Sequence, residues 1–123
     1  MKQFTSNELS ELVQSLDALP STPCPCGTAR RAFLNLPHSP QASVHWVDIK
    51  QSAQTHYHQK TTEIYVVLEG EGFIELNGIQ FPIKPLTAVY IYPGIRHRAI
   101  GNLKILNIPI PAFDSSDEFI VES

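Results

Sequence analysis

Short apolar runs separated by turn residues fill the chain from residue 29 onward, and they constrain the fold more than any other feature. An Asn77-Gly78 pair separates two of these runs. Both residues tolerate positive φ, so an Asn-Gly pair between apolar runs predicts a tight β-hairpin. Many short strands with turns about every 8 to 12 residues predict an all-β fold, either an antiparallel sandwich or a barrel. The predicted strands occupy residues 30–36, 43–49, 63–70, 72–76, 79–83, 87–93, 96–100 and 103–110.

A different periodicity precedes the strands. Residues 6–19 carry apolar side chains at helical spacing, which predicts one short N-terminal helix. Ser6 or Asn7 is suited to cap its start, and Pro20 to end it. We expect the apolar stripe to pack on its own domain or its own dimer, and a stripe that binds another protein is the alternative. The stripe consists of Leu9, Leu12, Val13, Leu16 and Leu19.

The length of 123 residues suits a single domain. Residues 1–28 are predicted to form the N-terminal helix and a proline-rich connector, and residues 29–123 the β-barrel. The acidic tail, residues 111–123, is expected to add a strand or loop to the barrel surface. A net charge of −3 leaves no basic surplus for nucleic acid. An apolar fraction of 42% suits a packed core.

The sequence also bears on the compartment. No run of 18 apolar residues is present, so we expect no membrane-spanning segment. The first residues lack the apolar core of a signal peptide, and we therefore expect a cytoplasmic protein. A disulfide between Cys24 and Cys26 would close a small, strained ring, which favours free thiols without a catalytic role. A soft-metal site at this CPC sequence is the alternative.

Three histidines and a glutamate stand out because of their spacing. His56 and His58 are two residues apart, so both point to one face if the segment is extended. Four residues then separate His58 from Glu63, enough for a bend that returns the carboxylate beside them. His97 follows a Pro93-Gly94 turn signal. One lone histidine would be interpreted as a surface or core residue, but the four together match a known pattern.

That pattern is typical of the cupin superfamily, whose first motif has the form G-x5-H-x-H-x3-4-E-x6-G. The chain resembles it from His56 through Glu63 to Gly70. The second motif, G-x5-P-x-G-x2-H-x3-N, is matched at Gly94 and His97. These matches cover roughly residues 40 to 110. The departures from the two motifs are Lys50, Leu86, Tyr92 and Gly101, and they affect turns rather than ligands.

The resemblance implies a double-stranded β-helix, the jelly-roll barrel of cupins. The sequence looks most like the small single-domain cupins that are loosely grouped with mannose-6-phosphate isomerase. By this resemblance the metal ligands are His56, His58, Glu63 and His97. Three imidazoles and one carboxylate suit a divalent transition metal: Zn, Ni, Fe, Mn, Co or Cu. Four protein ligands on an ion that accepts five or six leave one or two positions for a small molecule.

Strand alternation adds two residues around this centre. Tyr65 shares the face of Glu63 and is our candidate substrate contact, although a role as a core aromatic is equally compatible. His45 and Asp48 fall on opposite faces of their strand. We expect His45 at the surface, and a position that supports the metal ligands is the alternative.

The resemblance does not decide the function, because this fold hosts very different activities. We expect a metal-dependent enzyme, isomerase-like or dioxygenase-like, that acts on a small oxygenated molecule. Whether the protein is catalytic stays open at this point, and the alternative is a non-catalytic protein that binds or senses a small molecule or metal. Exposed sheet edges and the N-terminal apolar stripe lead us to expect a homodimer.

Overall fold

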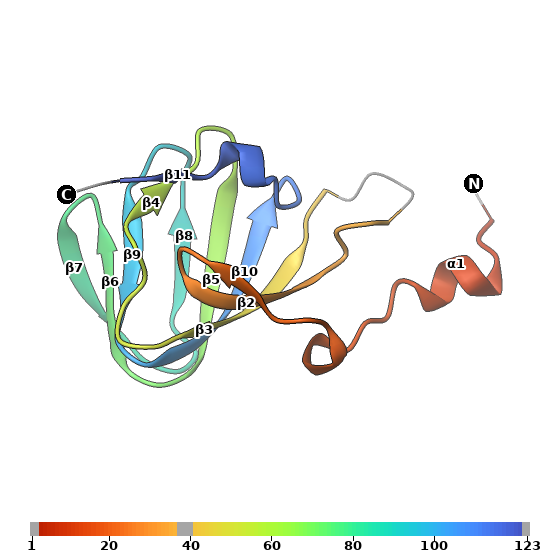
Figure 1. Cartoon of the computed structure of the whole chain (residues 1–123), viewed down its shortest axis with the longest axis horizontal. Helices are drawn as coiled ribbons and strands as arrows, with labels where there is room; N and C mark the ends of the chain where they lie inside the picture. Colours follow the sequence, from red (N-terminus) through yellow and green to blue (C-terminus); the bar gives the residue numbers. More distant parts are fainter. Residues whose placement is uncertain (1–2, 37–40, 122–123) are drawn as a thin grey trace.

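The computed structural model describes residues 3–36 and 41–121 and consists mainly of two antiparallel sheets that face each other (Figure 1). The first sheet has the order β1 (Thr22–Cys24), β2 (Gly27–Ala32), β3 (Val44–Ile49), β10 (Leu103–Ile110), β5 (Thr62–Glu69) and β8 (Ala88–Ile91). The second has the order β11 (Phe119–Ile120), β4 (His56–Tyr57), β9 (His97–Ile100), β6 (Gly72–Leu76) and β7 (Ile79–Ile83). The predicted all-β jelly-roll architecture is confirmed.

Alternation along the strands builds the core between the sheets. In β3, β5 and β10, buried and partly exposed residues alternate, as expected for strands with one face inward. The predicted β6–β7 hairpin is present, and Asn77 and Gly78 both have positive φ, 48° and 85°. The core side chains are Ala29, Val47, Ile49, Ala53, Tyr65, Val67, Ile74, Ile83, Ile91, Ala99, Leu103 and Ile105.

The N-terminal helix is much shorter than predicted. Helix α1 covers only Ser6–Ser10, and a separate 3-10 turn, η1 (Leu16–Ala18), follows. Thr5 caps α1 in a capping box with Glu8, but no residue of the helix is buried. A helix this short gains little from its own hydrogen bonds and needs packing to extend. The prediction of a helix over residues 6–19 is therefore wrong beyond Ser10.

The predicted connector, residues 20–28, contains strand structure. Strand β1 pairs with β2 in a tight hairpin, so the strands begin before residue 29. The hairpin brings the Cα atoms of Cys24 and Cys26 to 5.1 Å, and the two sulfur atoms form a disulfide. The expectation of free thiols is therefore wrong, because the turn supplies the proximity that the spacing alone did not reveal. That the pair has no catalytic role stays a prediction.

Gly27 makes this hairpin possible. Its φ is 131°, and a Cβ atom there would collide with the carbonyl oxygen of Asp48 on the neighbouring strand. Within residues 3–36 and 41–121, no helix has the length and hydropathy that crossing a membrane requires.

Candidate metal centre

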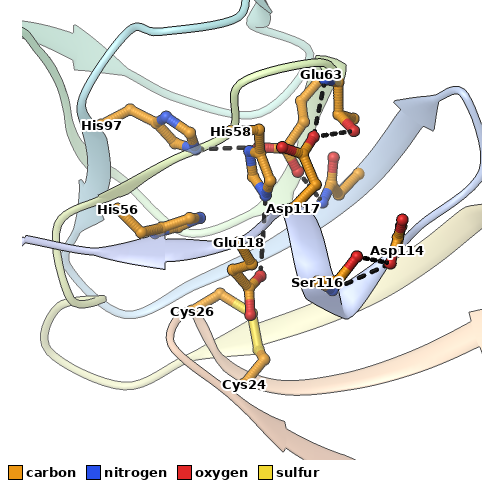
Figure 2. A network of polar contacts seen from close by, with 12 residues as sticks. Cys24, Cys26, His56, His58, Glu63, His97, Asp114, Ser116, Asp117 and Glu118 are labelled. Carbon is orange, nitrogen blue, oxygen red and sulfur yellow. Dashed lines mark hydrogen bonds and ion pairs between the residues drawn. A yellow bond between two sulfur atoms is a disulfide. The ribbon is translucent and has the colours of Figure 1, made fainter.

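Both sheets contribute to one buried cluster of four side chains. His56 lies on β4, His58 directly after it, and His97 at the start of β9, where it is the cross-strand partner of His56. Glu63 projects from β5 of the facing sheet (Figure 2). One ligand atom from each of the four lies within 4.8 Å of the others, and all four residues are buried. The structure thus brings together all four residues that the motifs predicted as ligands.

Two of the histidines are oriented by backbone carbonyls. The Nδ1 atom of His56 lies 2.9 Å from the Gln54 carbonyl oxygen, and that of His97 lies 2.9 Å from the Ile95 carbonyl oxygen. A histidine that donates its Nδ1–H in this way has an unprotonated Nε2, which is a metal ligand. Burial, followed by the charge of His97, lowers the pKa of His56 to about 4, so its imidazole is neutral near pH 7.

The donor set fits a metal ion. Oε1 of Glu63 lies 2.9 Å from Nε2 of His97 and 3.2 Å from Nδ1 of His58. Yet Oε1 of Glu63 and Nε2 of His97 are both buried and have no hydrogen-bond partner in the described chain. Two lone pairs that face each other at this distance require a positive charge between them, which either a proton or a metal ion supplies. Oε2 of Glu63 accepts a hydrogen bond from the Asn107 amide at 2.7 Å, which fixes the carboxylate.

His58 lies between two carboxylates. Its Nδ1 faces Glu63, and its Nε2 lies 3.8 Å from Oε2 of Glu118, which comes from the C-terminal tail (Figure 2). Burial alone would lower the pKa of His58, but hydrogen bonding to Glu118 and Glu63 outweighs it and raises the pKa to about 9. A metal ion that binds this imidazole must therefore displace a proton near pH 7.

Asp117 holds the tail against the centre. Its buried carboxylate accepts hydrogen bonds from the backbone N–H groups of Gln59, Lys60 and Thr61, at 2.9, 3.0 and 3.1 Å. The Thr61 hydroxyl donates a further bond at 3.0 Å. Burial opposes the charge on Asp117, but these hydrogen bonds lower its pKa below the ordinary value. The tail thereby fixes the loop between His58 and Glu63 and places Glu118 beside the ligands.

Tyr65 lies inside the barrel, as predicted from its alternation with Glu63. It is 5% exposed, and its ring packs edge-on against His97 with centroids 6.0 Å apart. Burial, followed by the charge of Glu63, raises the pKa of Tyr65 well above 10, so the phenol stays neutral and can donate a hydrogen bond. Its role as a substrate contact stays a prediction.

The expectation that His45 lies at the surface is wrong. His45 is 2% exposed, its Nε2 lies 2.9 Å from the Ser43 hydroxyl, and its ring packs against Phe113. The residue shares the inward face of β3 with Val47, while Asp48 lies on the other face, as predicted. Burial and then the charge of Arg31 lower the pKa of His45 to about 4.

Sequence reasoning missed Asn107, Asp117 and Glu118. A signal existed for Asn107, because it occupies an inward position in the otherwise apolar run of residues 103–110. The two tail acids carried no such signal, because an acidic tail usually indicates a solvated surface.

Comparison with known proteins agrees with this architecture. The family model described as the cupin domain matches residues 45–106, which contain all four ligand residues. An uncharacterized protein of Methanocaldococcus jannaschii, MJ1618, is 35% identical over 80 residues. That match covers 62% of this chain and 64% of the relative, so the chain spans slightly less than two thirds of its length.

Solved structures show the same fold. A protein from Planctomyces limnophilus has 42% identity and a TM-score of 0.79, with 88% of this chain and 95% of that chain covered. Pac13 of Streptomyces, a nucleoside dehydratase, has 19% identity, a TM-score of 0.78 and 88% coverage of both chains. Oxalate decarboxylase of Bacillus subtilis has 18% identity and a TM-score of 0.73, with 88% of this chain and 31% of that chain covered. With its double-sheet fold, its buried His and Glu cluster and the family model matched across half its length, this chain belongs to the cupin domain family.

Proposed function

We propose that the protein is a metal-dependent enzyme that acts on a small molecule with two adjacent oxygen atoms. The observation that carries the proposal is the convergence of four ligand side chains beside a further carboxylate, Glu118, that is not among the four. A divalent transition ion held by these ligands would polarise substrate oxygens and stabilise negative charge as it develops on them. The metal identity and the choice between isomerisation and dioxygenation follow from the experiments below.

The residues of the centre have two kinds of role: some bind the metal, and one transfers a proton. Glu63 is fixed by Asn107 and points at the imidazoles, so it serves as a ligand and is not free to act as a base. Glu118 reaches the centre from outside this set, and its side chain is 18% exposed, so it is accessible to a bound molecule. We assign it the transfer of a proton to or from the substrate. The neutral Tyr65 hydroxyl is assigned to a substrate oxygen as a hydrogen-bond donor.

Relatives of the same fold support a small-molecule ligand. Pac13 was solved with uridine, and the name of oxalate decarboxylase identifies a small dicarboxylate as its substrate. Both share less than a fifth of their aligned residues with this chain, so they support the size of the ligand and not its identity.

Metal content is the first test. Elemental analysis of the purified protein is expected to find one divalent transition ion per chain, and His58→Ala should lose most of it. His45→Gln is the matched control, because His45 is an equally buried histidine of the same barrel that is not a ligand. This variant should keep its metal. Full occupancy in His58→Ala would contradict the ligand assignment.

Ligand access is the second test. The Co²⁺-loaded protein is titrated with acetohydroxamate, a bidentate oxygen ligand, while the visible absorption of cobalt is recorded. We expect a spectral change below millimolar concentration. No change at millimolar concentration would mean that no small molecule reaches the ion, and the proposal would fail.

Catalysis is tested by a screen of 2-keto acids, enediols and sugar phosphates under air and under argon. Glu118→Gln is expected to abolish turnover and to keep the acetohydroxamate response. The alternative function, a non-catalytic sensor, predicts ligand binding without turnover and a Glu118→Gln variant that behaves like the wild type.

The expected homodimer, the cytoplasmic location and the domain boundary near residue 28 are further proposals. They rest on the apolar surface and the sequence features given above.

A further inference from the structure

A row of polar side chains crosses the inner face of the six-stranded sheet. Arg31 on β2 is the cross-strand partner of His45 on β3, His45 is that of Asn107 on β10, and Asn107 is that of Tyr65 on β5. Cross-strand partners share a face and stand about 5 Å apart. All four side chains therefore project to the interior at one level of the barrel.

The neighbouring level is entirely apolar. The corresponding residues one step further along the same four strands are Ala29, Val47, Ile105 and Val67, each at most 3% exposed. On the other side of the polar row, β5 carries Glu63, a ligand of the candidate metal centre. Along β5, the polar row thus lies between the apolar level and the residue that contributes a ligand to the centre.

Arg31 is the member of this row that carries a permanent positive charge. The amide of Asn107 bonds to Glu63, and the imidazole of His45 to Ser43. Among the described residues, no carboxylate lies within 4.0 Å of the Arg31 guanidinium, and its Nε is buried without a hydrogen-bond partner. The guanidinium forms a cation–π contact with Phe113, and its carbon lies 4.2 Å from the ring centroid. Arg31 is only partly buried, but its buried Nε lacks a partner among the described residues, and an anionic ligand at this position would satisfy that donor.

The adjacent arginine shows what a purely structural role looks like. Arg30 points to the opposite face of β2, and its Nη1 donates hydrogen bonds to the carbonyl oxygens of Asp17 and Leu19, at 2.9 and 2.6 Å. Arg30 therefore attaches the N-terminal segment to the sheet, whereas no such hydrogen bond joins Arg31 to another described residue. The two neighbours form a natural pair of test and control.

The surroundings of Arg31 are suited to receive an anion. Phe113 supports one face of the guanidinium plane, and the Ser43 hydroxyl in turn accepts a hydrogen bond from the Phe113 backbone N–H at 3.0 Å. A guanidinium stacked in this way keeps its edge free, and that edge matches the two oxygens of a carboxylate or phosphate. Arg31 also lines a cavity of about 460 Å³ on the side of the N-terminal segment, and none of the four ligand residues lines that cavity. Burial lowers the pKa of Arg31, and the charge of Glu118 opposes this, which places the cation near the same acid that contacts His58.

We infer that the small molecule bound at the metal centre is an oxyanion, and that Arg31 binds its carboxylate or phosphate group while two other oxygens face the ligands. This inference rests on the proposed function and narrows its substrate to an anionic class. It makes Arg31 a specificity residue and not a metal ligand.

The test compares three chelators that share one hydroxamate group. Acetohydroxamate carries no further anion, succinic monohydroxamate adds a carboxylate, and phosphonoacetohydroxamate adds a phosphonate. Each is titrated into the Co²⁺-loaded full-length protein, and the dissociation constant is read from the cobalt spectrum. We expect one of the two anionic chelators to bind at least about tenfold more tightly than acetohydroxamate. The chelator that binds more tightly identifies the anion as a carboxylate or a phosphate.

Arg31→Met should remove this preference and leave acetohydroxamate binding and the cobalt content unchanged. Arg30→Met is the control and should keep the preference. Arg31→Gln, which retains a polar but shorter and uncharged side chain, provides a second variant if Arg31→Met folds poorly, and it should also lose the preference. An unchanged preference in a folded Arg31 variant would overturn the inference. If no chelator alters the wild-type spectrum, the proposed function fails first, so the two failures are distinguishable.

Discussion

The two ends of the chain lie very differently on the barrel (Figure 1). At the N-terminus, α1 stands apart from the sheets, and Leu9, Leu12 and Val13 are 50%, 47% and 83% exposed. At the C-terminus, a short segment that also carries apolar side chains pairs with β4 through β11 and buries Asp117. Its Phe113 and Phe119 rings pack against His45 and Tyr57, whereas no residue of α1 is buried. Strand pairing, ring contacts and hydrogen bonds to the barrel, rather than apolar content alone, therefore distinguish the attached end from the exposed one.

The largest expected effect comes from releasing the C-terminal segment. Asp117→Ala removes the acceptor of four hydrogen bonds and leaves three backbone N–H groups of the ligand-bearing loop without a partner. We expect a loss of about 3 kcal/mol in the free energy of unfolding, measured by urea denaturation. Metal affinity should fall as well. Asp114→Ala is the control, because the exposed Asp114 carboxylate accepts hydrogen bonds from Ser116 and from no other described residue. Equal losses in the two variants would show that Asp117 does not hold the tail.

Low pH should weaken the attachment of the C-terminal segment to the barrel. The pKa of Asp117 is lowered in the folded protein, so the unfolded chain binds more protons at low pH and stability falls as pH decreases. This contribution is fully present above the ordinary aspartate value of about 4 and is lost below it. The gap in urea midpoint between the wild type and Asp117→Asn should therefore be constant from pH 5 to 7 and shrink toward pH 2.5. A gap that does not change with pH would contradict a charged Asp117.

A smaller effect is expected from the tail's second acid. With Glu118→Gln, His58 loses one of the two carboxylates that raise its pKa to about 9. We expect the pKa of His58, followed by NMR in metal-free protein, to move down toward its ordinary value. Glu69→Gln is the control, since Glu69 pairs with Lys104 at the surface, and it should leave His58 unchanged. If the pKa of His58 stays near 9 in Glu118→Gln, the tail does not act on the centre electrostatically.

The smallest effect on stability is expected at the N-terminus. Val13→Asp should change the free energy of unfolding of a monomer by no more than about 0.5 kcal/mol, because the side chain is exposed. The same variant also tests the oligomeric state, which light scattering measures. The wild type is expected to be a homodimer of the 13.7 kDa chain. Val13→Asp should dissociate this dimer if the N-terminal segment around Val13 contributes to the interface. Exposed Ser10→Asp is the charge control. A monomeric wild type would refute the dimer.

The strands and the four ligands were predictable because their signals are local. Alternation and the Asn77-Gly78 turn mark the strands, and the ligand spacings follow from two continuous motifs. The rest depends on distant partners. The end of α1 at Ser10 reflects missing packing, and the Cys24–Cys26 disulfide depends on the β1–β2 turn. The positions of His45 and Glu118 depend on which chain segments cover them, and no local pattern in the sequence records this.

The distribution of the ligands over both sheets also has a consequence for folding. His56 and His97 are far apart in the chain but meet on adjacent strands, while Glu63 comes from the opposite sheet. A single ion at this point would close a long loop of chain and connect the two layers at once, in the manner of a reversible covalent bridge. Strand β4 has only two residues, and only His56 pairs with β9, so we expect this strand to depend most on the bound ion. Loss of the ion should therefore open the barrel first at β4, so amide exchange there would report metal occupancy before any global unfolding.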